Sequence, residues 1–395
     1  MSWEKQFAEF AGRLQNDGLP LAIRLWNGDT AIGSNPAVVI SVPTLAALRH
    51  LFNPTLDSLG RAYVEGKIEI EGCVHDIVNV ATRLVAYGKH SGIPSSPNPF
   101  KFLHTRKTDA DAIAYHYDVS NEFYSLWLDR NMVYSCGYFI TPQDSIETAQ
   151  IQKIDHILDK VNIQPGDRLL DIGCGWGGLI MRAAEKYGAK ALGITLSQNQ
   201  YEFAKERIST AGLSDRCEVR IQDYRDVTGK FERITSVGMF EHVGLKNLRS
   251  YFAKIESLLT DNGVVMNHGI TSCDVDSKIS HWGADDFMDN YVFPDSETPH
   301  IALTLKEMCG AGLEPVDVEN LRRHYVYTLN HWTERFEQQS DRLRAIAGEK
   351  RYRIWRLYLA GCAYGFAQNW ISLHQILAVK AGFGALPLTR DYIYQ

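Results

Sequence analysis

The chain has 395 residues, of which 45% are hydrophobic and 22% charged, a balance typical of soluble globular proteins. Its formal net charge of −6 excludes a surface built to coat nucleic acid, and no apolar run reaches the roughly 18 residues that a membrane-spanning helix needs. Seven scattered cysteines without a C-x-x-C pair, behind a charged N-terminus unlike a signal peptide, favour reduced thiols in a cytoplasm over a disulfide framework or a metal site.

The first 90 residues alternate short extended stretches with helical ones and predict a small α+β domain. The expected strands are LAIRLWNG and AVVISV, and the expected helices are TLAALRHLF and HDIVNVATRLVAYG. The stretch HSGIPSSPNPF that follows is dense in proline, serine and glycine, which predicts a seam between domains. We therefore divide the chain into an N-terminal domain at 1–90 for lipid engagement or dimerisation, a linker at 91–110 and a catalytic domain at 111–395.

After the seam, helical residues lead into a regular alternation of strands and helices. The expected strands are DRLLDIG, AKALGIT, RCEVRIQD, ERITSVGMF and GVVMNHGI, and the expected helices are GLIMRAAEKYG, SQNQYEFAKERISTAG and NLRSYFAKIESLLTDNG. This alternation predicts an α/β fold with a doubly wound, mostly parallel sheet, followed by a mostly helical C-terminal third. Ligands of such sheets bind beyond the carboxyl ends of the strands. Those ends carry Asp171, Thr195, Asp223, Glu241 and His268.

A glycine loop follows the first of these strands. Gly173, Gly175 and Gly178 form G-x-G-x-x-G between a strand and a helix, where missing side chains let a ligand approach the backbone. A nicotinamide-binding loop is followed by an acidic residue at the end of the second strand, but this strand ends at Thr195 without one. Asp171 instead precedes the loop, where its carboxylate can face an ammonium group. This D-x-G-x-G form resembles the class I S-adenosylmethionine-dependent methyltransferases.

Seven motifs in order make the resemblance specific: HYDVSNEFYSLWLD, MVYSCGYF, LLDIGCGWGG, GITLSQNQ, QDYRD, MFEHVG and YVFPDSETP. From about Ala112 to the C-terminus, the sequence resembles the cyclopropane-fatty-acyl-phospholipid synthases, a family that includes the mycolic acid cyclopropane synthases. The resemblance implies a Rossmann-like class I methyltransferase fold and a methylene transfer from S-adenosylmethionine to the cis double bond of a phospholipid acyl chain. One departure is Pro294-Asp295-Ser296, where many relatives have Pro-Gly-Gly.

The resemblance also assigns residues to three parts of a site and implies no metal. The cofactor would be bound by Tyr134, Ser135, Asp171, Gly173, Gly175, Thr195, Gln200, Gln222 and Asp223. A bicarbonate ion would be held by Cys136, Glu241, His268, Ile270 and Tyr325. The acyl chain would pass the aromatic rings of Tyr117, Tyr138, Phe139, Tyr291 and Phe293.

The reaction that the resemblance implies needs a base beside an apolar chain. Attack of the alkene on the sulfonium methyl leaves a carbocation, and ring closure then requires removal of a proton from the new methyl group. A lone carboxylate in an apolar tunnel tends to protonate, whereas a small anion held by several donors does not. Glu241 would orient the bicarbonate and receive its proton. We expect the backbone N–H of Cys136 to matter more than its sulfur, because no base is identifiable beside it and the reaction needs no covalent enzyme intermediate.

Each of these residues also has a structural interpretation. Glu241 could cap the following helix, His268 could be a core histidine with satisfied hydrogen bonds, and Tyr325 and the other aromatic residues could be ordinary core. From Asp341 to Arg356 the chain carries six basic and two acidic residues interleaved with aromatic ones. This stretch fits either a helix on an anionic bilayer or a solvated charged face with a buried aromatic stripe.

The sequence leaves three functions open. The first is cyclopropane synthesis by a cytoplasmic homodimer bound peripherally to the inner face of the membrane, with unsaturated phospholipids as partners and no nucleic acid. The second is a related methyltransferase that makes a methyl-branched lipid or methylates an amine. The third, from another class, is a non-catalytic lipid-binding protein with a methyltransferase fold, against which the intact glycine loop and Asp171 argue.

Overall fold

The computed structural model describes residues 2–52, 54–87, 119–276, 287–288, 291–292, 297–384 and 386–394. The chain forms two compact units, each assembled from three segments. Unit 1 consists of residues 1–99, 279–294 and 336–364, and unit 2 of residues 100–278, 295–335 and 365–395. Unit 1 thus includes part of the C-terminal region, which a division of the sequence at the proline-rich seam does not reveal.

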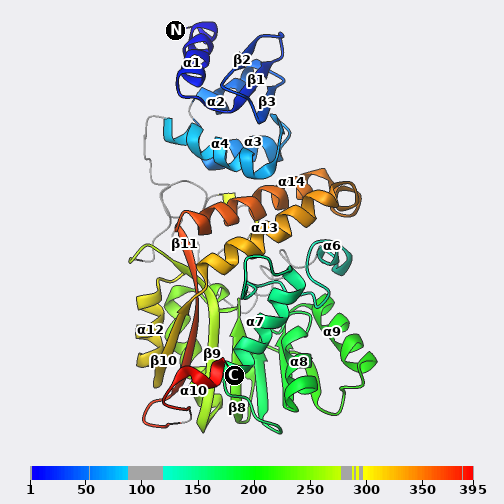
Figure 1. The fold of residues 1–395 in the computed structure, drawn as a ribbon, viewed down its shortest axis with the longest axis vertical. Helices are drawn as coiled ribbons and strands as arrows, with labels where there is room; N and C mark the ends of the chain where they lie inside the picture. Colours follow the sequence, from blue (N-terminus) through cyan, green and yellow to red (C-terminus); the bar gives the residue numbers. More distant parts are fainter. Residues whose placement is uncertain are drawn as a thin grey trace. The chain divides into compact units, whose positions relative to one another are not determined.

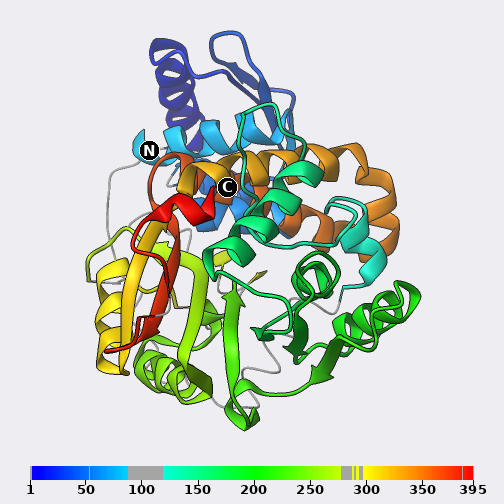
Figure 2. The same cartoon turned by 60° about the horizontal axis from the view of Figure 1, so that its bottom comes forward.

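Among the described residues of unit 2, seven strands form one sheet in the order β10-β11-β9-β8-β5-β6-β7 (Figures 1 and 2). The strands are β5 Arg168–Ile172, β6 Lys190–Thr195, β7 Cys217–Ile221, β8 Phe231–Val237, β9 Leu259–Ser272, β10 Leu313–Asn320 and β11 Ile371–Lys380. Strands β5 to β9 pair in parallel, while β11 pairs antiparallel with both β9 and β10. The predicted α/β class with a mostly parallel sheet is confirmed.

Strands β10 and β11 show that the prediction of a mostly helical C-terminal third was incomplete. Strand β11, ISLHQILAVK, is buried along most of its length and lies inside the sheet, so its apolar residues do not alternate with exposed polar ones. Such a run has no period of two and cannot be told from a buried helix by its pattern. The expected helix NLRSYFAKIESLLTDNG also ends earlier, since its last residues from Leu259 onward begin β9.

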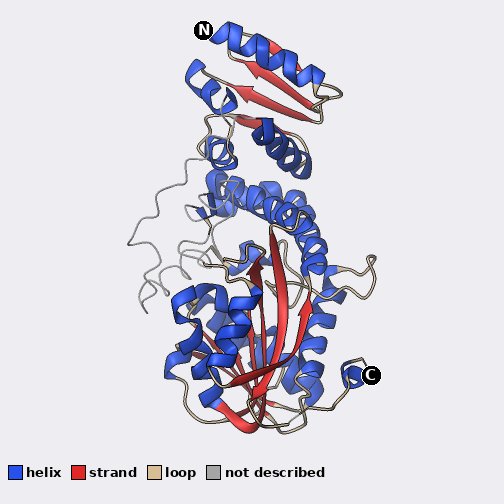
Figure 3. Cartoon of the chain, turned by 90° about the vertical axis from the view of Figure 1, so that its left-hand side faces the viewer, coloured by secondary structure: helices blue, strands red, loops and turns tan. Residues whose placement is uncertain are grey.

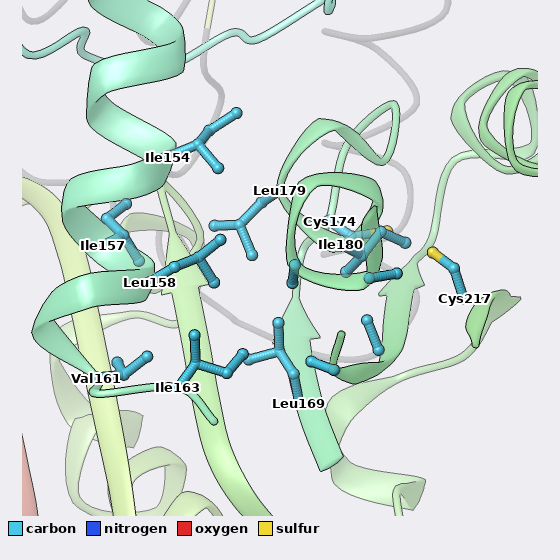
Figure 4. Close-up of a cluster of buried hydrophobic side chains, with 14 of the residues drawn as sticks. Ile154, Ile157, Leu158, Val161, Ile163, Leu169, Cys174, Leu179, Ile180 and Cys217 are labelled. Atoms are coloured by element: carbon cyan, nitrogen blue, oxygen red, sulfur yellow. The ribbon is translucent and has the colours of Figure 1, made fainter. Parts of the chain in front are cut away.

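Helices lie on both faces of this sheet (Figure 3). They are α7 Ile146–Lys160, α8 Gly178–Tyr187, α9 Gln198–Thr210, α10 Leu248–Leu258 and α12 Ile301–Gly310. Two further helices are α6 Asn121–Ser125 and α13 Arg322–Gln338. On one face, Ile157 and Leu158 of α7 pack with Ile180 of α8 over the sheet (Figure 4). On the other face, α10 and α12 form a separate core. The two cores fix the strand ends, and therefore the loops that follow them.

Unit 1 is a small α/β domain, as expected for the first 90 residues. A four-stranded sheet in the order β2-β1-β3-β4 is formed by described residues. Its strands are β1 Leu21–Leu25, β2 Thr30–Ile32, β3 Val38–Val42 and β4 Glu69–Glu71, and its helices include α1 Trp3–Asn16, α2 Arg49–Phe52, α3 Leu56–Val64 and α4 Val74–Tyr87. Helix α1 was not predicted, although its Phe7 and Leu14 are buried at helical spacing.

The basic, aromatic stretch lies in α14 Ser340–Ala367 and is largely internal to unit 1. Arg356 donates to Glu337 at 2.9 Å and to the Gly72 carbonyl at 2.9 Å, and Arg353 donates to Glu69 at 2.7 Å. The interleaved aromatic residues, Tyr352, Trp355 and Tyr358, are buried. This arrangement matches the interpretation of a buried aromatic stripe. None of the helices built from described residues is long and apolar enough to cross a membrane.

Candidate active site

The glycine loop between β5 and α8 lines a cavity at the carboxyl ends of the parallel strands. Gly173 and Gly175 have φ angles of +79° and +54°, which L side chains adopt only with strain. A Cβ on Gly173 would also lie 3.2 Å from the Cβ of Met239. Both the positive φ angles and the close approach of Met239 therefore favour glycine in this loop, and its backbone is open to a ligand at the start of α8.

Eight of the nine residues expected to bind the cofactor line this cavity. These are Tyr134, Ser135, Asp171, Gly173, Gly175, Thr195, Gln200 and Gln222. Thr195 donates its hydroxyl to Gln200 Oε1 at 2.8 Å, so both side chains are fixed where a nicotinamide-binding protein has an acid. The ninth residue, Asp223, is turned toward Arg225 at 2.7 Å, and its neighbour Tyr224 lines the cavity instead.

Asp171 is the buried carboxylate of this cavity. Its Oδ1 accepts a hydrogen bond from Thr235 Oγ1 at 2.7 Å. Burial raises the pKa of Asp171 to about 6, against the opposing effects of the Thr235 hydroxyl and of Lys153. An ammonium group placed beside Asp171 would stabilise its ionised form, so the residue fits the amine end of S-adenosylmethionine.

The segment that carries Tyr134 and Ser135 is fixed by two polar residues of α7 that the sequence analysis missed. Gln150 Nε2 donates to the Ser135 carbonyl at 2.8 Å, and Lys153 Nζ donates to Ser135 Oγ at 2.8 Å. Lys153 is itself a cavity residue, 2% exposed. A signal was present, because Gln150 and Lys153 fall on the helical face shared with the buried Ile146 and Ile157.

Two residues expected to hold bicarbonate have buried polar atoms that no described residue satisfies. Glu241 follows β8 and accepts from the Ile270 N–H through Oε1 at 2.7 Å, leaving Oε2 without such a partner. His268, on β9, accepts from the side-chain amide of Gln375 at Nδ1 over 3.2 Å. The other ring nitrogen, His268 Nε2, has no partner among the described residues. Burial raises the pKa of Glu241 to about 7 and lowers the pKa of His268 well below its usual value. In this structure the Ile270 amide is engaged by Glu241.

Hydrogen bonds connect the remaining residues of this group. The Leu321 carbonyl accepts from Cys136 Sγ at 3.9 Å and from the Tyr325 N–H at 3.1 Å. The Leu321 N–H donates to Leu373 of β11, which pairs with Ile270 of β9. The structure therefore gathers Cys136, Ile270 and Tyr325, which are far apart in sequence, around the junction of α13 with the antiparallel end of the sheet.

Cys136 is fully buried, and burial raises the pKa of its thiol far above the usual range. A protonated thiol is a poor nucleophile. We therefore expect Cys136→Ser to lower kcat by no more than about tenfold, about 1.4 kcal/mol of barrier, because it exchanges one protonated group for another. Steady-state kinetics beside a thermal unfolding curve check this. An inactive variant that is folded and binds cofactor would show that the sulfur itself matters.

None of the described residues predicted to line an acyl channel borders the cofactor cavity. The ring of Tyr138 stacks between His156 and His324, with centroids 4.1 and 4.8 Å away. Phe139 stacks on His331 at 5.7 Å. The Tyr138 ring thus lies between α7 and α13, and the Phe139 ring packs on α13, so both hold the loop after Cys136 in place.

The other aromatic candidates lie elsewhere. Tyr291 belongs to unit 1, where its hydroxyl donates to Glu65 Oε1 at 2.8 Å. Tyr117, Phe293 and the stretch Pro294-Asp295-Ser296 lie outside the described residues. Within the described ranges, no group of three or more histidine, cysteine or acidic side chains could hold a metal ion.

The sheet order, the glycine loop and the cavity at the strand ends define a class I S-adenosylmethionine-dependent methyltransferase. Residues 104–376 match the family described as mycolic acid cyclopropane synthetase, and residues 13–87 match a domain of unknown function. The chain belongs to this cyclopropane synthetase family, which confirms the resemblance identified from the motifs.

Individual relatives agree with this assignment. The chain is 46% identical to a probable fatty acid methyltransferase of Pseudomonas putida, over 98% of this chain and all of the relative. It is 36% identical to the cyclopropane-fatty-acyl-phospholipid synthase of Escherichia coli K12, over 70% of this chain and 69% of the relative.

Solved structures agree as well. The cyclopropane synthase MmaA2 from Mycobacterium tuberculosis superposes with a TM-score of 0.66 at 32% identity, covering 70% of this chain and 99% of its own. The mycolic acid cyclopropane synthase CmaA1, solved with S-adenosylhomocysteine, also gives 0.66 at 31% identity, covering 69% and 98%.

Proposed function

We propose that the protein is a cyclopropane-fatty-acyl-phospholipid synthase that uses S-adenosylmethionine as methylene donor and bicarbonate as general base. The observation that carries the proposal is the pair of buried atoms Glu241 Oε2 and His268 Nε2, neither satisfied by a described residue. Unsatisfied buried polar atoms are rare in folded proteins and call for a ligand or ordered water.

The donors and acceptors of this pair fit bicarbonate. Gln375 donates its amide N–H to His268 Nδ1, so the neutral ring carries its proton on Nε2 and offers a donor. Ionised Glu241 offers an acceptor at Oε2. Bicarbonate carries both an anionic oxygen, which can accept from His268 Nε2, and an O–H, which can donate to Glu241 Oε2. Donation by the Ile270 amide would require its bond to Glu241 to be exchanged.

The chain's own residues would serve the reaction as follows. When bound, S-adenosylmethionine supplies an electrophilic methyl group. Asp171 and the glycine loop would orient it, and the rings that line the cavity, Tyr134, Trp176 and Tyr224, would stabilise positive charge on the acyl chain. Glu241 would orient the bicarbonate, which supplies the base for ring closure, and would receive the proton of its O–H at Oε2. As part of the same proposal, the enzyme acts as a homodimer on phospholipids at the inner membrane surface.

The test is incubation of the purified protein with S-adenosylmethionine, bicarbonate and vesicles of a monounsaturated phospholipid, followed by proton NMR of the lipid. High-field cyclopropane protons, reduced in bicarbonate-depleted buffer and restored by its addition, are expected. Lipid heavier by one CH2 but without these protons would overturn ring closure and support a methyl-branched product. If the lipid is not modified at all, both ring closure and methyl branching are overturned.

Methyl branching is the second candidate because of the relatives' names. A relative 46% identical is named a probable fatty acid methyltransferase, and another, 32% identical, is named a tuberculostearic acid methyltransferase. The two products share the cofactor cavity and differ in the fate of one proton. The same NMR spectrum therefore separates them.

A further inference from the structure

A buried lysine lies in the cofactor cavity, and none of the described carboxylates forms an ion pair with it. Lys153 lies on α7, is 2% exposed, and its Nζ donates to a hydroxyl, Ser135 Oγ, at 2.8 Å. A buried ammonium without a carboxylate in contact is costly. The other fully buried lysine of the same helix, Lys160, has a carboxylate, Glu319, in direct contact at 2.5 Å.

Two carboxylates, Asp129 and Asp171, influence the pKa of Lys153, but the hydrogen bonds they accept come from other groups. Asp129 accepts the N–H groups of Asn131 and Val133, each at 2.8 Å, and Asp171 accepts the Thr235 hydroxyl. Both act on Lys153 by charge and oppose the lowering of its pKa by burial, which brings the pKa to about 8. The cavity therefore contains a cation whose direct contact is a neutral oxygen.

That contact also directs the Ser135 hydroxyl. Because Ser135 Oγ accepts a hydrogen bond from Lys153, its own hydrogen must be donated in another direction, and Ser135 lines the cavity. Gln150 holds the Ser135 carbonyl from the preceding turn of α7, so the donor is fixed in place. A cationic Nζ and an oriented O–H together suit a carboxylate.

We propose that Lys153 and Ser135 recognise the carboxylate of S-adenosylmethionine, while Asp171 recognises its ammonium group, so that the cavity selects an intact amino-acid end. This inference rests on the proposed use of S-adenosylmethionine. It assigns specificity to a helix outside the glycine loop. The charges agree with it, since Lys153 and Asp171 both line the cavity and are opposite in sign, as are the carboxylate and the ammonium group of an amino acid.

The competing role for Lys153 is purely structural, as a clamp on the segment from Asn131 to Ser135. The two roles differ in one measurable respect. A recognition residue affects only ligands that carry a carboxylate, whereas a clamp affects every ligand of the cavity equally. Two ligands are therefore needed: S-adenosylhomocysteine, and its analogue that lacks the carboxylate but keeps the amine.

The experiment is calorimetric titration of both ligands into the full-length protein. We expect the unaltered protein to prefer S-adenosylhomocysteine by about 10–100-fold, the range of one charged hydrogen bond. Lys153→Met should abolish most of this preference by weakening S-adenosylhomocysteine alone. Lys160→Met, the matched control on the same helix, should leave the preference unchanged.

The outcomes separate the inference from the function beneath it. If Lys153→Met weakens both ligands equally, or keeps the preference, the recognition role is overturned while cofactor use stands. If the unaltered protein binds neither ligand, the proposed function itself fails. Should Lys153→Met not fold, Ser135→Ala provides the second test, with a smaller loss of preference expected and an unchanged preference counting against the inference.

Discussion

Glu241→Gln is expected to lower kcat by about 10²–10⁴, the usual contribution of a positioned group that takes part in proton transfer. Glutamine keeps an oxygen to accept the Ile270 N–H, so the loop after β8 retains its hydrogen bond. It replaces the unsatisfied Oε2 acceptor by an amide donor that cannot receive a proton. Because Glu241 does not line the cofactor cavity, S-adenosylhomocysteine should bind as before.

The pH profile adds a second signature. Burial raises the pKa of Glu241 to about 7, so the carboxyl is protonated below that pH and ionised above it. Activity that needs the ionised form therefore rises as pH increases through about 7. In Glu241→Gln this limb should vanish from the residual activity. Glu185→Gln, on the exposed surface of α8, serves as the control. A Glu241→Gln enzyme with full activity and an unchanged pH profile would refute the role of Glu241 in proton transfer.

The parallel half of the sheet was predictable from the sequence because turn residues and helices next to each strand in the sequence mark where it begins and ends. DRLLDIG, for example, follows a Pro-Gly turn and runs into glycines whose positive φ angles match the letters. Strands β10 and β11 carry no such local mark. The partners of β11 lie 99 to 115 residues earlier in β9 and 54 to 67 residues earlier in β10, as in the pairs Ile371 with Ser272 and Lys380 with Leu313. Only tertiary structure reveals such pairs.

The candidate site also has a part that the sequence predicts and a part that only the tertiary structure shows. Residues at strand ends and in the glycine loop follow from topology, and eight of the nine expected cofactor residues line the cavity. Side-chain choices do not follow from topology: Asp223 turns to Arg225, and the Ile270 amide bonds to Glu241. Lys153 escaped notice because a lysine in an amphipathic helix is normally read as solvent-facing, and its burial depends on Ser135 from another segment.

Asp171→Asn is expected to weaken S-adenosylhomocysteine binding by about 10–100-fold and at the same time to stabilise the protein. Asparagine keeps an oxygen for the Thr235 hydroxyl, so the local hydrogen bond survives, but the charge that would face the ligand's ammonium group is lost. Opposite signs for affinity and stability distinguish this variant from a substitution that merely damages the fold. Calorimetry and thermal unfolding of one preparation measure both.

The sign of the stability change follows from the pKa of Asp171, which burial raises from 3.8 to about 6. Ionisation is harder in the folded chain than in the unfolded one, so stability is lost as pH rises between these two values and stays lost at neutral pH. Removing the carboxylate should restore up to about 3 kcal/mol near neutral pH, less the attraction to Lys153 that disappears with it. In acid, where Asp171 is protonated in both states, the difference should vanish. Asp215→Asn, at an exposed carboxylate, should change neither the affinity for S-adenosylhomocysteine nor the free energy of unfolding. An Asp171→Asn protein that is less stable at neutral pH would show that the buried charge stabilises the fold and is not there for the ligand.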